Sequence, residues 1–271
     1  MDNIIDAHAH IFPSKIERVA TDAIGSFYGY GMSHTGSIEE LLRSGGKAGV
    51  SRFVVFSTAT TPLQVEKIND FIMESCAKHP EFIGAGTMHP EYGAYREELG
   101  RIYAGGLRGI KLHPDFQKFY VDCDELLSVF DYLQEKNMFL ITHSGDFRYE
   151  FSDPVRVARV AKMFPRLNIV AAHFGGWSEW EKARRVLSDL PNVYCDTSST
   201  FGCGGREEVI AGFRSFDSTH IFFGVDFPMW DHAEELRQLR SVGLDDETLE
   251  NVLHRNFERF FAKYEAGDAR I

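Results

Sequence analysis

The chain has 271 residues, and 44% of them are hydrophobic, which is enough to bury one sizeable core. Its 40 acidic side chains outnumber the 29 basic ones, so the net charge is −11. This charge argues against broad attraction to nucleic acid or to an anionic membrane, and it favours a small-molecule partner. The four cysteines form no C-x-x-C pair, and the N-terminus lacks a basic start and a long apolar run. We therefore expect a cytoplasmic protein with one domain over residues 1–271, and homo-oligomers stay possible.

Eight short apolar runs rich in β-branched residues recur along the chain, and most are followed by a longer segment with helical spacing. Runs such as Phe53-Val54-Val55-Phe56 are apolar throughout, as is typical of parallel strands buried on both faces. An open sheet would show similar runs, but eight units in about 250 residues favour a closed (β/α)8, or TIM, barrel. The predicted strands cover residues 3–8, 52–57, 82–88, 107–113, 138–143, 168–173, 192–196 and 220–226.

The segments between these strands predict an outer ring of helices. Ser37 stands three residues before Glu40, and Asp153 stands directly before Pro154, and both patterns are typical of helix starts. The stretch 25–36, rich in Gly and Tyr, is the longest irregular segment and follows the first strand, where loops often shape a substrate site. Amphipathic spacing predicts helices over residues 37–48, 62–78, 124–136, 154–164, 178–190 and 245–264.

Polar residues end several of the apolar strands. His8 and His10 end the first strand, His143 ends the fifth and Asp226 ends the eighth. Parallel barrel strands deliver their C-terminal ends to one face, so these residues should converge. His8 and His10 also share one side of an extended strand, which lets both imidazoles bind one ion. The sequence therefore predicts one divalent ion, most simply Zn²⁺, held by His8, His10, His143 and Asp226.

Two of these four residues could instead have a purely structural role. His143 could be bonded to a neighbouring loop and not to an ion. Asp226 is a buried acid that needs a cation or a donor, and it could pair with Lys111 or Arg108 across the barrel. Neither structural role accounts for the convergence of all four residues on one face, so the metal site is preferred.

His173 ends the sixth strand and is open to two interpretations. It could be a further nitrogen ligand, or it could orient the attacking water and carry its proton. The second role is preferred. Asp226 would take a proton from the water and pass it to the leaving group. Asp226 and His173 are therefore the predicted catalytic residues.

Lys111 and His113 lie two residues apart on the fourth strand and so share a face. Either side chain could contact substrate. A carboxylated Lys111 could bridge two ions, which leaves a second metal possible, but a charged lysine that balances nearby carboxylates is simpler. His113 should face the cavity without being an obligatory ligand.

Four further residues lie near the predicted strand ends or loops. Trp177 and Trp230 come just after strand ends and could line an apolar substrate wall. His34 could reach the site from the first loop, and His232 is expected to be an ordinary surface or helix residue.

Taken in chain order, these motifs resemble the amidohydrolase superfamily, and more narrowly its amidohydrolase-related branch of aminocarboxymuconate semialdehyde decarboxylase-like proteins. The resemblance spans nearly the whole chain. It implies a (β/α)8 fold and a divalent ion, commonly zinc, with His8, His10, His143 and Asp226 at ligand positions and His173 at the activated water. Val225 departs from the usual small residue before the last aspartate. The motifs are Asp6-Ala7-His8-Ala9-His10, Gly109-Ile110-Lys111-Leu112-His113-Pro114, Thr142-His143-Ser144-Gly145, Ala172-His173-Phe174-Gly175-Gly176, Phe223-Gly224-Val225-Asp226-Phe227-Pro228 and Asn256-Phe257-Glu258-Arg259-Phe260-Phe261.

These features predict a metal-dependent hydrolase that uses metal-activated water on a small, carboxylated substrate with an amide, lactone or carbon–carbon bond. The alternative is a metal-dependent non-oxidative decarboxylase, because the resembling family contains both kinds of enzyme. A barrel that binds a metabolite without turnover is a third possibility, and four converging ligands argue against it.

Overall fold

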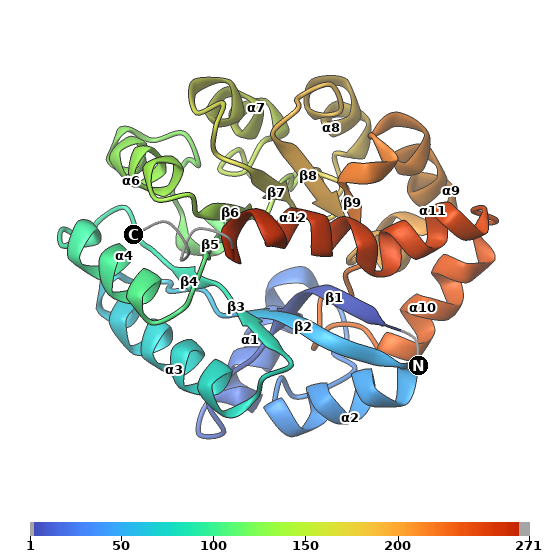
Figure 1. The fold of residues 1–271 in the computed structure, drawn as a ribbon, viewed down its shortest axis with the longest axis horizontal. Coiled ribbons are helices and arrows are strands. Elements are labelled where there is room, and N and C mark those ends of the chain that lie inside the picture. Colours follow the sequence, from blue (N-terminus) through green and yellow to red (C-terminus); the bar gives the residue numbers. More distant parts are fainter. Residues whose placement is uncertain (1–2, 266–271) are drawn as a thin grey trace.

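The strands form a parallel α/β barrel with helices around it (Figure 1). The computed structural model describes residues 3–265, so residues 1–2 and 266–271 of the predicted domain lie outside the described residues. The TIM-barrel fold predicted from the strand count is confirmed. The strands are β1 (Ile4–His10), β2 (Val50–Phe56), β3 (Phe82–Gly84), β4 (Gly86–Thr87), β5 (Gly109–Leu112), β6 (Phe139–Thr142), β7 (Ile169–Ala171), β8 (Val193–Asp196) and β9 (Ile221–Phe222).

The predicted third strand is divided in two. β3 and β4 flank Ala85, so the strands fall into a three-stranded sheet, β1 to β3, and a six-stranded sheet, β4 to β9. Ala85 donates its N–H to the carbonyl of Val55 at 3.0 Å, which extends the pairing of β3 with β2 by one residue. The hydrogen-bond ladder is therefore interrupted at Ala85, although the order of the strands around the ring is the expected one.

The second junction lies between β1 and the chain that follows β9. Three backbone bonds join these segments: Ala7 N–H to the Phe223 carbonyl at 2.8 Å, Asp226 N–H to the His8 carbonyl at 2.8 Å, and His10 N–H to the Phe227 carbonyl at 2.7 Å. Single hydrogen bonds rather than a continuous ladder therefore bring the first strand beside the eighth.

Helices form in all six segments for which amphipathic spacing predicts them, and further helices over residues 17–28, 95–104, 114–117, 200–215 and 232–241 were not predicted. Ser37 accepts the N–H of Glu40 at 3.2 Å and Asp153 accepts that of Val155 at 2.8 Å, as the helix-start patterns indicate. The helices are α1 (Glu17–Tyr28), α2 (Ile38–Ala48), α3 (Val65–Lys78), α4 (Tyr95–Ala104), α5 (Pro114–Gln117), α6 (Asp124–Glu135), α7 (Pro154–Met163), α8 (Trp180–Leu187), α9 (Thr200–Ser215), α10 (His232–Ser241), α11 (Asp246–Glu250) and α12 (Asn256–Glu265). Short turns of 3₁₀-helix cover Pro62–Gln64 and Ser218–His220, and a π-helical turn covers Asn251–Arg255.

Two expectations about the helices are corrected. The stretch 25–36 is not irregular throughout, because α1 continues to Tyr28 and ends at Gly29, whose φ of 73° suits a residue without a Cβ. The predicted helix over residues 245–264 is divided into α11, the π-helical turn and α12. Among residues 3–265, no helix combines the length and apolarity needed to cross a bilayer.

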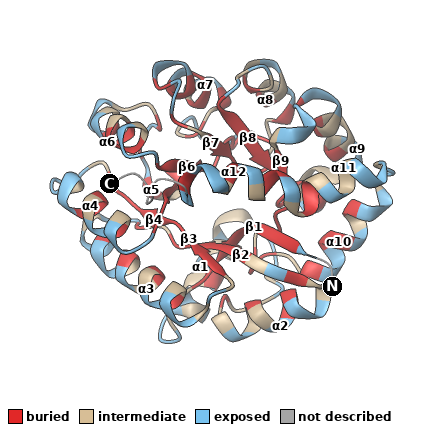
Figure 2. Ribbon diagram, viewed as in Figure 1, coloured by how far each residue is buried: buried red, intermediate tan, exposed pale blue. Residues whose placement is uncertain are grey.

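Two apolar cores hold the barrel together. One lies between the strands and the outer helices, and the other fills the barrel beneath α12. The Phe260 ring of α12 lies 5.3 Å from Phe139 and 4.8 Å from Tyr194, centroid to centroid. Figure 1 shows α12 crossing the front of the barrel, and Figure 2 shows buried strands inside helices with exposed outer faces. α12 covers one mouth of the barrel. The other mouth, where the C-terminal ends of the strands lie, is not covered by α12, and a site can form there.

Two adjacent glycines of α2 test the packing of the helix ring on the strands. A Cβ on Gly45 would lie 2.3 Å from the Phe53 ring, whereas one on Gly46 would meet no atom within 4 Å. We expect Gly45→Ala to lower the free energy of unfolding by about 1–3 kcal/mol through overpacking. Gly46→Ala should raise it by up to about 1 kcal/mol. Urea unfolding followed by circular dichroism measures both values, and equal effects would contradict the close contact at Gly45.

Candidate metal centre

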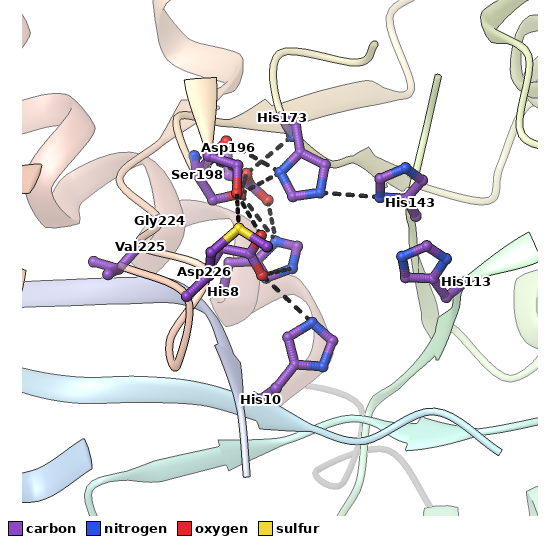
Figure 3. A network of polar contacts seen from close by, with 12 residues as sticks. His8, His10, His113, His143, His173, Asp196, Ser198, Gly224, Val225 and Asp226 are labelled. Atoms are coloured by element: carbon purple, nitrogen blue, oxygen red, sulfur yellow. Dashed lines mark hydrogen bonds and ion pairs between the residues drawn. The ribbon is translucent and has the colours of Figure 1, made fainter. Parts of the chain in front are cut away.

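The polar strand ends surround one enclosed cavity at the open mouth of the barrel (Figure 3). Its volume is about 10 Å³, room for about one water molecule. The inner wall is polar and the outer wall is mostly apolar. The inner wall consists of His8, His10, Lys111, His113, His173 and Asp226, and the outer wall of Ile24, Tyr28, Met32, Phe116, Pro228 and Met229.

His8, His10 and Asp226 bring three possible ligand atoms together. The Oδ1 of Asp226 lies 3.5 Å from Nε2 of His8 and 3.5 Å from Nε2 of His10. Two atoms that each lie about 2.1 Å from one tetrahedral ion are about 3.4 Å apart, so the spacing fits a shared ion. Burial lowers the pKa of both histidines well below the usual value. Both imidazoles are therefore neutral at pH 7, the form that ligates a metal.

Asp196, at the end of β8, orients the ring of His8. The Nδ1 of His8 donates to Oδ2 of Asp196 at 2.9 Å, which leaves Nε2 unprotonated on the side of Asp226. The other oxygen of Asp196 accepts the N–H groups of His173 and Ser198, each at 3.1 Å. Asp196 was not predicted as a site residue, although it ends the predicted strand 192–196 just as Asp226 ends 220–226.

Ser198 determines which nitrogen of His173 carries the proton. The Ser198 hydroxyl donates to Asp196, so it can only accept from His173 Nδ1, which lies 2.8 Å away. The Ser198 carbonyl also lies 3.0 Å from that nitrogen. The proton of His173 is therefore on Nδ1, and Nε2 is a free acceptor. Burial lowers the pKa of His173 to about 4, so the ring is neutral at pH 7.

His143 lies beside the cavity wall rather than in it, stacked on His113 with ring centroids 4.1 Å apart (Figure 3). Its Nε2 lies 2.8 Å from the carbonyl of Gly145, which only accepts, so that nitrogen carries the proton. Its unprotonated Nδ1 then faces Nε2 of His173 at 3.1 Å. Two lone pairs at this distance repel unless a proton or a metal ion lies between them. The bond to Gly145 is compatible with the alternative role of His143, and Nδ1 remains available to an ion.

Lys111 is completely buried beside the ligand group. Its Nζ lies 3.2 Å from Nε2 of His8 and 4.8 Å from the ring centroid of Phe56. Burial lowers the pKa of Lys111 to about 8, and the charges of Asp226 and Asp196 partly oppose this effect. The amine thus places a cation, or at higher pH a neutral amine, next to the nitrogen that would bind a metal.

The two tryptophans predicted to form an apolar wall stand behind the cavity. The Trp177 ring packs against Tyr28 with centroids 4.9 Å apart. Trp230 donates from Nε1 to the Ser199 hydroxyl at 2.9 Å, and Ser199 donates to Oδ2 of Asp226 at 2.5 Å. Trp230 therefore contacts Asp226 only indirectly, through Ser199. No pattern in the sequence identifies Ser199 as a site residue.

His232 begins α10, so it is a helix residue as one part of the expectation had it, but it is completely buried and not at the surface. Its Nε2 donates to Oδ2 of Asp6 at 3.1 Å. The other oxygen of Asp6 accepts the N–H groups of His8 and Val225, each at 3.0 Å. Asp6 thereby ties β1 to the residue that precedes Asp226.

The backbone at the site adopts conformations that favour glycine. His173, Ser199 and Asp226 have φ values of 61°, 56° and 66°, in the left-handed region. Such conformations cost about 1–3 kcal/mol each when the residue is not glycine. Gly224, by contrast, is needed for space: a Cβ there would lie 3.1 Å from the Cβ of His8. The fold thus holds three site residues in strained conformations.

Comparison with known proteins places these residues in context. A protein-family model described as amidohydrolase matches residues 5–263. The comparison with curated proteins found no match. Among solved structures, an uncharacterised TIM-barrel protein from Bordetella bronchiseptica is 18% identical over 97% of this chain and 99% of that one, with a TM-score of 0.80.

Two further solved structures are similar to the chain. A dihydroxybenzoic acid decarboxylase from Polaromonas sp. JS666, with bound manganese and the inhibitor 2-nitroresorcinol, is 15% identical over 97% of each chain, with a TM-score of 0.75. A candidate 2-pyrone-4,6-dicarboxylic acid hydrolase from Pseudomonas putida is 15% identical over 97% of this chain and 98% of that one, with a TM-score of 0.70. At these identities the likeness shows the fold alone.

Glu235 of α10 provides a test of the electrostatics around the centre. It is 1% exposed, and neither carboxylate oxygen has a hydrogen-bond partner among residues 3–265. Burial first, and then Glu234, Asp226 and Asp6, raise its pKa to about 8. The folded protein therefore keeps this proton between about pH 4.5 and pH 8, where the unfolded chain has lost it. Over this window Glu235 makes the free energy of unfolding fall as the pH rises.

We expect Glu235→Gln to make that fall shallower by up to about 1.4 kcal/mol per pH unit. Denaturant unfolding at intervals between pH 5 and pH 8 measures the slope. Glu181→Gln on α8 is the matched control, because Glu181 is exposed, pairs with Arg185 and is not among the charges that raise the pKa of Glu235. Its slope should equal that of the parent protein. A Glu235→Gln protein with the parent slope would show that Glu235 is ionised in the folded state.

The contact between Asp196 and His8 predicts a change in metal affinity. Asp196→Asn removes the charge that orients His8 and replaces one acceptor oxygen by an amide. We expect the affinity for Zn²⁺ to fall about 10- to 100-fold. Calorimetric titration of metal-free protein measures this, with Asp189→Asn in an outer loop as the control. An unchanged affinity would show that His8 needs no support from Asp196.

Proposed function

Because the chain belongs to the amidohydrolase family, whose model matches residues 5–263, we propose that it is a metal-dependent hydrolase of a small, carboxylated molecule. The bond broken would be an amide, a lactone or a carbon–carbon bond. The observation that carries the proposal is the approach of Asp226 Oδ1 to within 3.5 Å of both His8 Nε2 and His10 Nε2. These atoms come from β1 and from the segment after β9, which meet where the barrel begins and ends.

The donor set fits one divalent ion. His8 and His10 would each contribute Nε2 and Asp226 would contribute Oδ1, with Nδ1 of His143 as the further ligand that the family resemblance implies. When bound, such an ion polarises a water or substrate oxygen and increases its acidity. Nitrogen donors with one carboxylate suit zinc, which we propose as the ion. Manganese is bound in the similar dihydroxybenzoic acid decarboxylase, so manganese is the alternative ion to zinc.

The side chains around the cavity would have three roles: to position Asp226, to transfer a proton and to balance the charge of a substrate carboxylate. Ser199 holds Oδ2 of Asp226 by a hydrogen bond, so Oδ1 faces the cavity. The unprotonated Nε2 of His173 can take a proton from a group in the cavity and return it to a leaving group. Lys111 places a positive charge where it can balance a substrate carboxylate. The mostly apolar outer wall leaves the His10 and Asp226 side chains only 10% and 13% exposed, and limited contact with bulk water strengthens each of these interactions.

A non-oxidative decarboxylase is the second candidate, and the likeness to the dihydroxybenzoic acid decarboxylase favours it. The likeness to the candidate 2-pyrone-4,6-dicarboxylic acid hydrolase favours the first. In a decarboxylation, His173 or Asp226 would first take up a proton from water or a substrate hydroxyl, and would then deliver it to the carbon that loses carbon dioxide. The same residues thus serve either reaction, and the products distinguish them.

We expect purified protein to carry about one equivalent of zinc or a similar ion, measured by elemental analysis after exhaustive dialysis. Metal-loaded protein is then incubated with N-acyl compounds, lactone dicarboxylates and hydroxybenzoates, each bearing a carboxylate. A hydrolysed product without carbon dioxide supports the first proposal, and released carbon dioxide supports the second. Metal-replete protein that is inactive on every class would support a binding barrel instead.

Two substitutions separate ligation from proton transfer. Asp226→Asn should weaken metal binding and nearly abolish turnover, because it removes an anionic donor and a proton acceptor. His173→Asn should keep its metal and lose turnover by roughly 100- to 10,000-fold. Metal content measured beside activity tests both. If His173→Asn loses metal as readily as His8→Asn, His173 is a ligand and another group handles the proton.

A further inference from the structure

The cavity beside the candidate ligands is too small for a substrate. With a volume of about 10 Å³ it has room for about one water molecule. Its outer wall includes Ile24 and Tyr28 of α1, and Met32 from the loop after α1. A molecule larger than water therefore fits beside the ligands only if part of this wall moves.

A larger groove lies on the other side of the wall. Its volume is about 650 Å³, within the range of small-molecule sites. Arg18, Asp22 and Glu40 contribute charged groups to it. His34, which the sequence left as a residue that could reach the site, lines this groove, with Nε2 3.2 Å from Asp231. Among the described residues, Met32 is the only one that lines both the cavity and the groove.

The helical part of the wall is held in place. The Tyr28 hydroxyl lies 2.8 Å from Nε2 of His113. Arg148 donates to the carbonyl of Phe27 at 2.6 Å, and it also donates twice to the buried carboxylate of Asp146, at 2.9 and 2.7 Å. The end of α1 is thereby tied to the loop after β6, so moving it would break several bonds at once.

The backbone on one side of Met32 is also tied. The N–H of Ser33 donates to the Met229 carbonyl at 3.2 Å, and that of His34 donates to the Pro228 carbonyl at 3.1 Å. The Met32 side chain itself is unbranched and has three rotatable bonds. It lies in the space that Gly25 leaves on α1, since a Cβ there would be 3.2 Å from its Cγ. Met32 can therefore move by side-chain rotation alone.

We propose that Met32 is the gate between the metal centre and the outer groove, and that the groove is the outer end of the substrate path. The inference rests on the proposed function for the identity of the inner site. It implies an elongated substrate, with the reacting group in the cavity and a polar remainder in the groove beside Arg18 and His34. Met32 is thus a residue that determines substrate length.

The first test measures access to the metal. Zn²⁺-loaded protein is mixed with excess ethylenediaminetetraacetate, and the rate of metal extraction is recorded. Met32→Ala should speed extraction about threefold or more, and Met32→Trp should slow it by a similar factor, with the equilibrium affinity unchanged. The control is Met163→Ala on the outer face of α7, where Met163 is 47% exposed. It should match the parent.

The second test needs no metal. Diethyl pyrocarbonate modifies accessible histidines, and mass spectrometry of metal-free protein gives the rate at His10. We expect the same order, Met32→Ala fastest and Met32→Trp slowest. Equal rates in all variants would overturn the gate, and so would extraction rates that change only in step with metal affinity. A parent protein that binds no metal would contradict the proposed function, and the rates at His10 would still decide the gate.

Discussion

The site depends on the hydrogen bonds by which Asp6 joins the first strand to the segment after the last one. One oxygen of Asp6 accepts the N–H groups of both His8 and Val225, and the other accepts from buried His232. Residues from opposite ends of the chain are thereby fixed at hydrogen-bonding distance. Since no continuous strand ladder spans this junction, the carboxylate provides part of the closure that a ladder would otherwise supply. The spacing of the candidate ligands on either side follows from this junction.

The fold and the main group of site residues could be predicted from the sequence because both depend on repeated patterns. Buried parallel strands must be apolar, so the polar residue that ends each run, such as His8 or Asp226, is conspicuous. The partners that orient these groups leave weaker signals. Ser198 and Ser199 act through single hydroxyl groups in a loop, and any serine would look the same. Asp196, by contrast, ends an apolar strand, so it could have been predicted as a site residue on the same grounds as Asp226.

The segment after the first strand shows why local patterns fail. Gly25 and Ser26 are poor helix formers, and they favoured an irregular stretch where α1 in fact continues to Tyr28. Tertiary contacts outweigh the local preference here. Arg148 bonds to the helix end and packs its guanidinium over the Phe27 ring at 4.6 Å. The division of the third strand at Ala85, by contrast, does have a local signal, because Gly84 and Gly86 flank Ala85 and glycine weakens the interior of a strand.

The left-handed backbone of His173, Ser199 and Asp226 has a consequence for how the protein could change over time. Each of these residues has a backbone conformation that glycine adopts with less strain. The packed interior must therefore offset the free energy that this strain costs at the mouth of the barrel. A population selected only for heat tolerance would gain from relaxing these positions, whereas one selected for turnover would keep them strained. Selection for thermal stability and selection for catalysis therefore favour different residues at these three positions. In a lineage that has lost the catalytic activity, we expect glycine to replace these residues first.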